Sequence, residues 1–227
     1  TAETHKNIIT TLSQSINLAM DNESLIERHN AFVDYTLALV FSATGHRAVK
    51  DPISSIRQID LQNGLILISD KVTHENRAWR LVALPAIACE QIQNYLDYLP
   101  KLAANLENEV AGALLPTKIR QLFSHSEAIP LFFYLSDTRL GDIENITPKL
   151  MAQRWSKCWS LPINFLRHTA ATELLKLESA DYAQIQLGHA SGNAHQFGEN
   201  AAESAKDTLA KIGLALNKYL REMGWKP

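Results

Sequence analysis

Arginine, lysine and histidine side chains stand out in three separated regions of the 227-residue chain. Residues 44–47 read Thr-Gly-His-Arg, residues 70–71 read Asp-Lys, and the third region combines Leu-Arg-His-Thr at 166–169 with Leu-Gly-His at 187–189. A guanidinium group carries several N–H donors in a rigid, permanently charged fork that suits a phosphate. Each region also has an ordinary explanation, because helix C-termini and turns favour solvated cations. Their order along the chain is therefore more informative than any one of them.

In order and spacing these regions resemble the catalytic domain of the tyrosine recombinases, the phage-integrase family. That family has a Thr-Gly-x-Arg turn, a lysine in a β-hairpin, a helix with Leu-Arg-His-Thr-x-Ala-Thr, and then Leu-Gly-His. Here residues 166–172 read Leu-Arg-His-Thr-Ala-Ala-Thr, and residues 187–191 read Leu-Gly-His-Ala-Ser. The resemblance covers residues 24–189. It implies the family's fold, a mainly α-helical α+β domain with a small antiparallel three-stranded sheet.

The resemblance also implies a site for a DNA phosphodiester. In the family a tyrosine attacks the phosphodiester and forms a covalent phosphotyrosyl link. By this resemblance Arg47 and Arg167 clamp the phosphate oxygens, Lys71 protonates the leaving oxygen, and His189 donates a hydrogen bond to the phosphate. The partners implied are double-stranded DNA and further copies of the chain on that DNA, with no metal and no small-molecule cofactor. The residues expected to contact DNA around the site are Arg77, Arg80, Lys149, Arg154, Lys157 and His168.

Two positions depart from the family's pattern. Asn164 stands three residues before Arg167, where the family usually has a histidine. An amide can hydrogen-bond a phosphate, but it cannot exchange a proton in acid–base catalysis. No tyrosine occurs between Tyr182 and Tyr219, and Phe197 is the aromatic residue nearest the usual place of the nucleophile. A phenylalanine ring has no hydroxyl with which to form the covalent link.

Three explanations of the missing tyrosine stay open. Phe197 is an engineered replacement, the natural protein has lost cleavage, or the nucleophile comes from elsewhere, with Tyr219 in the last helix as the candidate. The chain is accordingly expected to act as a recombinase-like or integrase-like domain in mobile-element integration or excision. The alternative is a catalytically inactive DNA-binding or assembly protein that retains the fold. An unrelated helical protein is the third hypothesis, which a structure that separates Arg47, Lys71, Arg167 and His189 would favour.

The elements that must position these residues follow from the hydrophobic pattern. Helical spacing of apolar residues predicts helices over residues 7–20, 24–43, 86–99, 163–177 and 204–223, a shorter one over 116–123, and another that starts at 147–148. Ser24 is expected to cap the second helix, Gly45 to close it, and Pro100 to bend or end the third. Residues 56–61, 64–68 and 77–84 predict the three-stranded sheet. Residues 129–134 fit either an extended segment or a buried helix.

Three parts of the chain are expected. Residues 1–22 form an N-terminal helical segment or the remnant of a linker, residues 23–203 the recombinase-like catalytic domain, and residues 204–227 a C-terminal helix. In the family this last segment docks onto a neighbouring subunit, and packing back on its own core is the alternative. Relatives also close a clamp around DNA with a separate N-terminal domain, and we expect that half of the clamp to be missing from this chain.

The composition excludes several classes of protein. Hydrophobic residues make up 46% of the chain and the net charge is −2, so a polybasic protein is excluded, although residues 148–177 hold five basic residues and one acidic residue. Two cysteines cannot form a disulfide framework, and the chain suits a reducing, cytoplasmic compartment. No apolar run approaches the length of a membrane span, so we expect no membrane partner.

Overall fold

The computed structural model describes residues 2–21, 24–72, 77–109, 114–124, 128–177, 180–188 and 201–227. Over these ranges the chain is mostly helical and carries a small antiparallel sheet, so the expected α+β class is confirmed. The described helices are α1 (Ala2–Met20), α2 (Leu25–Thr44), α3 (Ala86–Glu109), α4 (Leu115–Leu122), α5 (Pro148–Trp155), α6 (Phe165–Leu177), α7 (Ala180–Leu187) and α8 (Ala201–Met223).

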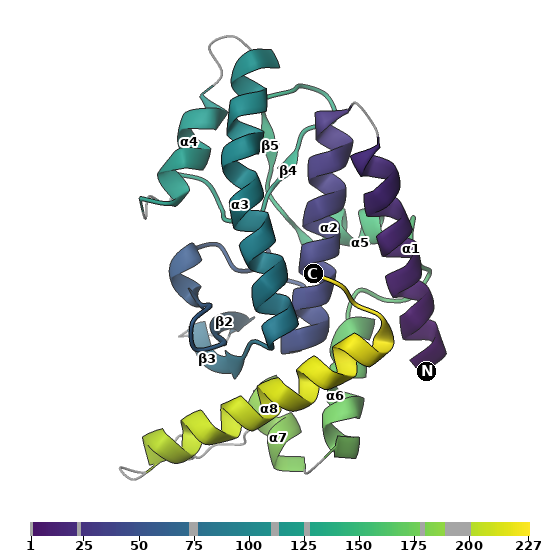
Figure 1. Ribbon diagram of the computed structural model, residues 1–227, viewed down its shortest axis with the longest axis vertical. Coiled ribbons are helices and arrows are strands. Elements are labelled where there is room, and N and C mark those ends of the chain that lie inside the picture. Colours follow the sequence, from purple (N-terminus) through teal and green to yellow (C-terminus); the bar gives the residue numbers. More distant parts are fainter. Residues whose placement is uncertain are drawn as a thin grey trace.

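Helix α2 runs through the middle of the molecule (Figure 1). The side chains of Leu37 and Leu39 are fully buried, and α1, α3, α6 and α8 all pack against the helix. As predicted, the Ser24 side chain caps its start by accepting a hydrogen bond from the Glu27 amide at 3.3 Å. Its end is closed by Gly45, which has a φ of 62° and donates its N–H to the carbonyl of Phe41. This left-handed cap directs the following residues out of the helix.

The predicted three-stranded sheet is confirmed, although residues 56–58 of the expected first strand form a short 3₁₀ helix instead. Strands β1 (Ile59–Asp60), β2 (Leu65–Val72) and β3 (Arg77–Ala83) pair antiparallel in the order β1-β2-β3, which leaves β3 at one edge. Ile66 faces Val82 and Ile68 faces Arg80 across β2 and β3. The side chains of Ile66, Ile68 and Val82 are fully buried, as expected of alternate residues on the inward face.

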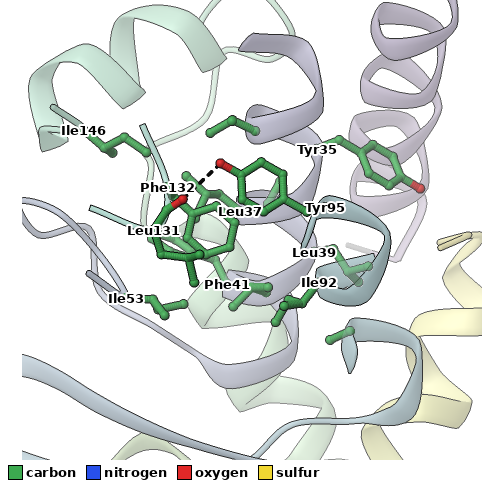
Figure 2. Close-up of a cluster of buried hydrophobic side chains, with 14 of the residues drawn as sticks. Tyr35, Leu37, Leu39, Phe41, Ile53, Ile92, Tyr95, Leu131, Phe132 and Ile146 are labelled. Carbon is green, nitrogen blue, oxygen red and sulfur yellow. Dashed lines mark hydrogen bonds between the residues drawn. The ribbon is translucent and has the colours of Figure 1, made fainter. Parts of the chain in front are cut away.

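Residues 129–134 form no helix, which settles the alternative left by the sequence. They run through the core as an irregular segment and lead into β4 (Tyr134–Leu135), which pairs with β5 (Ile143–Glu144). Figure 2 shows how this segment meets α2 and α3. The Tyr95 hydroxyl donates a hydrogen bond to the Leu131 carbonyl at 3.0 Å, and its ring stacks on Phe132 with centroids 4.8 Å apart.

Two helices differ from the expectation. Pro100 is expected to bend or end this helix, and helix α3 continues past it to Glu109, so the proline does not end it. The extension buries Leu102, Ala103 and Leu106 and packs against α4, and this burial outweighs the hydrogen bond that proline removes. Helix α7 has no counterpart among the predicted elements, because its eight residues are too few to show a clear period.

Both ends of the described chain join the common core. Ile8, Ile9 and Leu12 of α1 are buried beside α2, and Leu220 of α8 lies in the same apolar cluster. Helix α8 crosses the molecule beside α6 and α7 (Figure 1) and also contacts β3 and α3. Among the described helices, none combines the length and the apolar character that crossing a membrane requires.

His29 is the most enclosed titratable group of α2. Its ring is fully buried, its Nε2 lies 3.0 Å from the Phe133 carbonyl, and its Nδ1 has no hydrogen-bond partner among the described residues. Nε2 must donate, because a carbonyl oxygen can only accept. Burial lowers the pKa of His29 from 6.5 to about 4, and the charge of Arg154 adds to the effect. The folded protein therefore holds this ring neutral.

The lowered pKa of His29 makes stability depend on pH with a definite sign. The unfolded chain takes up a proton at this ring near pH 6.5, whereas the folded chain resists it down to about pH 4. Stability present above pH 6.5 is therefore lost as the pH falls through this window, by about 1.4 kcal/mol per pH unit. Urea unfolding of wild type and of His29→Gln between pH 7 and pH 4.5 checks this. The variant should show a shallower pH slope, and an equal slope in both proteins would contradict the assignment.

Candidate functional site

Four segments meet at the end of α2. The carbonyl oxygen of Gly45 accepts hydrogen bonds from two guanidinium groups, Nη2 of Arg80 at 3.3 Å and Nη1 of Arg167. Nη2 of Arg167 also donates to the Leu187 carbonyl at 2.9 Å, and Nη1 of Arg80 donates to the Gln186 carbonyl. The turn after α2, strand β3, the first turn of α6 and the end of α7 are thereby held in one place. We call this arrangement the Gly45 junction.

Arg167 is deeply placed in this junction, with 7% of its surface exposed. It projects from the first turn of α6, between the fully buried Leu166 and the exposed His168. A buried guanidinium is tolerated only where its N–H groups find acceptors. Here main-chain carbonyls from two other segments supply them, so the side chain ties α6 to α2 and to α7.

The backbone of the Arg47 turn is constrained on both sides. The His46 ring stacks on Phe41, with centroids 4.9 Å apart and planes 7° apart, and its Nδ1 lies 2.5 Å from the Arg47 carbonyl. On the other side a Cβ at Gly45 would overlap the Leu187 side chain, so this position needs glycine for space as well as for its positive φ. Arg47, itself half-buried, is thereby placed two residues from the shared carbonyl.

The remaining predicted residues lie at varied depth. Asn164 and His168 are exposed at the start of α6, and Lys149 and Lys157 are exposed at the two ends of α5. The main chain of Lys71 lies in β2 opposite Ala78, about 10 Å along the strand from Ile68, the partner of Arg80. The side chains of Lys71 and Arg77, and the whole of His189 and Phe197, lie outside the described residues.

Arg154, one of the residues expected to contact DNA, has an acidic partner within the fold. Its Nε and Nη2 lie 2.9 and 2.8 Å from Oδ2 of Asp34, and its guanidinium covers the Tyr134 ring at 4.5 Å. Oδ1 of Asp34 accepts hydrogen bonds from the Tyr134 hydroxyl at 2.6 Å and from Trp155 Nε1 at 3.0 Å. Burial raises the pKa of Asp34, and Arg154 and these donors oppose the shift. The ion pair fastens α5 to α2.

The hydroxyl of Tyr219 also has a partner within the fold. It lies 2.7 Å from Nδ1 of His5, and 6% of the residue is exposed. Burial raises the pKa of Tyr219 and lowers that of His5 to about 4, so both groups are neutral at pH 7. The phenol therefore joins α8 to α1. A buried phenol with a raised pKa is a poor nucleophile.

One residue of the junction was missed by the sequence reasoning. The side-chain amide of Gln186 is fully buried and bonds to both α2 and β3. The available signal was a polar side chain between Ile185 and Leu187, directly before the Leu-Gly-His motif. Among the described residues, no group of three or more His, Cys, Asp or Glu side chains could hold a metal ion.

No family model matches this chain, and no curated protein matches it. The resemblance to the tyrosine recombinases therefore depends on the motifs quoted above.

The role assigned to Arg154 can be tested by separating the fold from DNA affinity. Asp34→Ala should destabilise the protein by about 3–5 kcal/mol, because it leaves the largely enclosed guanidinium of Arg154 without its carboxylate and two buried donors, the Tyr134 hydroxyl and Trp155 Nε1, without their acceptor. The double variant Asp34→Asn with Arg154→Met should recover part of that loss, because the amide Oδ1 still accepts from the Tyr134 hydroxyl and from Trp155 Nε1 and neither charge is then enclosed. Urea unfolding measures both. If Arg154→Met in the double variant lowers the affinity for duplex DNA as much as Lys157→Ala does, the assignment to the fold alone is wrong.

Proposed function

We propose that this chain is a recombinase-like domain that binds a DNA phosphodiester at the Gly45 junction and acts in the integration or excision of a mobile element. One observation carries the proposal. The segments that bear the family's motifs, far apart in sequence, are joined by hydrogen bonds from Arg80 and Arg167 to the carbonyls of Gly45 and Leu187. Separate, ordinary explanations of the individual motif regions give no reason for these segments to meet.

The proposed chemistry follows from which side chains border the junction. Arg47 lies two residues after Gly45, whose carbonyl accepts a hydrogen bond from Arg167, so the proposal places both arginines beside the phosphate. Permanently charged, pre-aimed donors stabilise the negative charge on phosphate oxygens. In this proposal Lys71 supplies the proton for the leaving oxygen. The motif histidine, His189, directly follows Gly188, the residue after Leu187.

A second candidate is favoured by the position of Tyr219. This is a DNA-binding or assembly protein that keeps the fold but does not cleave. Tyr219, the candidate for a replacement nucleophile, is buried and its hydroxyl is hydrogen-bonded to His5, and Phe197 carries no hydroxyl. Both candidates share the phosphate site and differ only in the covalent step, so two separate measurements are needed.

The phosphate site is tested by binding. A pool of randomised 40-base-pair duplexes is enriched on the wild-type protein, and the affinity for the enriched duplex is measured over a series of salt concentrations. Arg47→Gln should weaken binding at least tenfold and reduce the salt slope by about one. The matched control is Arg120→Gln, which removes an equal charge from an exposed pair with Glu107 between α3 and α4. Enrichment of no duplex, or equal effects of the two variants, would contradict the proposed site.

The covalent step is tested with nicked suicide versions of the enriched duplex. The first candidate predicts a covalent protein–DNA adduct from wild type, whereas the second predicts no adduct from wild type and an adduct from Phe197→Tyr, each detected as a shifted band on a denaturing gel. An adduct from Phe197→Tyr alone would identify the missing hydroxyl at residue 197 as the reason that wild type forms no adduct. An adduct from wild type that Tyr219→Phe abolishes would establish Tyr219 as the nucleophile. Binding without an adduct from any variant would leave the second candidate as the function.

A further inference from the structure

We propose that Gln186 is a positioning residue of the Gly45 junction, holding the end of α7 so that Arg80 and Arg167 keep their geometry. The inference rests on the proposed function only for what the junction binds. It goes beyond the motif residues, because Gln186 stands outside all the motifs quoted above. Three side-chain hydrogen bonds and two neighbouring carbonyls support it.

The amide of Gln186 is fully used. Nε2 donates to the Ala43 carbonyl at 3.1 Å and to the Ala83 carbonyl at 2.8 Å, and Oε1 accepts from the Ala83 amide at 3.1 Å. The residue is fully buried. The reverse orientation of the amide would direct its oxygen at two carbonyls and its NH₂ group at an N–H donor, so the contacts fix the orientation. The side chain therefore has one well-defined position.

These bonds join a helix end to a strand edge. Ala43 lies in the last turn of α2, where carbonyls have no partner within the helix. Ala83 ends β3, the edge strand, and Gln186 pairs with both its N–H and its carbonyl as a neighbouring strand would. One side chain thus fixes the distance between α2 and the sheet and places α7 against both.

The main chain around Gln186 transmits this placement to the two guanidiniums. The carbonyl of Gln186 itself accepts from Arg80, and the carbonyl of Leu187 accepts from Arg167. Arg80 also passes close to Gly188, where an added Cβ would lie 2.7 Å from its Cδ. A shift of Gln186 would therefore displace acceptors of both arginines and the residue that precedes His189.

The chain offers a matched control at the other half of α2. Asn30 is buried, and its side-chain amide likewise pairs with both main-chain groups of a strand residue. Nδ2 donates to the Leu135 carbonyl at 2.9 Å, and Oδ1 accepts from the Leu135 amide at 2.8 Å. Asn30 precedes Gly45 by fifteen residues, about 22 Å along the helix. Loss of this amide should affect stability without reaching the junction.

The experiment compares Gln186→Met with Asn30→Leu, both close in shape to the residues that they replace. In ¹⁵N-labelled protein the guanidinium Nε–H signals of Arg80 and Arg167, assigned with single Arg→Lys variants, report the junction directly. We expect Gln186→Met to shift and broaden both signals and to weaken binding of the enriched duplex at least tenfold. Asn30→Leu should leave both readouts unchanged, although urea unfolding shows a comparable loss of stability. Where Gln186→Met does not fold, Gln186→Glu keeps the length and one acceptor but removes both donors.

Each outcome decides the proposal. Unchanged signals of Arg80 and Arg167 in the Gln186 variants would overturn it, as would equal effects from Asn30→Leu. Shifted signals with unaltered DNA affinity would also overturn it, because Gln186 would then serve the fold alone. If wild type enriches no duplex, the proposed DNA site fails. The arginine signals still decide whether Gln186 sets the junction.

Discussion

The carbonyl oxygen of Gly45 is the acceptor on which the junction depends. Because α2 ends in a left-handed residue, the main chain turns out of the helix there. Two guanidiniums, from β3 and from α6, reach this one oxygen. Hydrogen bonds from charged donors contribute about 1.5–3 kcal/mol each, more than neutral ones. A single well-placed carbonyl thus holds together segments that 122 residues separate along the chain.

Helix α2 provides the frame because polar side chains fasten it at several levels of an otherwise apolar core. Asn30 pairs with Leu135 near its start, Asp34 binds Arg154 one turn later, and the main chain of Ala43 receives Gln186 at its end. Buried polar groups are stable only when each finds its partner, so these contacts specify one arrangement of the surrounding elements. The apolar side chains between these contacts stabilise the core by burial, and the polar contacts fix how the neighbouring elements align along α2.

Local features of the fold could be predicted from sequence, whereas individual side-chain contacts between distant segments could not. Ser24, Gly45 and the start of α5 at Thr147 follow from capping chemistry, and the sheet follows from its apolar strands. Helix α3 passes Pro100 because of side chains buried against α4, which no local rule includes. For the same reason the pairing of Arg154 with Asp34, 120 positions away, could not be foreseen. Order and spacing of the motifs did identify the segments that meet at Gly45.

Binding and cleavage make different demands on such a fold, and the described contacts meet them unequally. Binding needs cations held in place, and main-chain carbonyls hold two arginines without neutralising them. Cleavage needs a phenol that can reach the phosphate and lose its proton. Tyr219 is instead enclosed between α1 and α8, with His5 as its partner and a raised pKa. Delivering Tyr219 to the junction would strip His5 of this hydrogen bond inside the core, at a cost of about 1–3 kcal/mol for the unsatisfied group. The fold therefore opposes use of this tyrosine as a nucleophile.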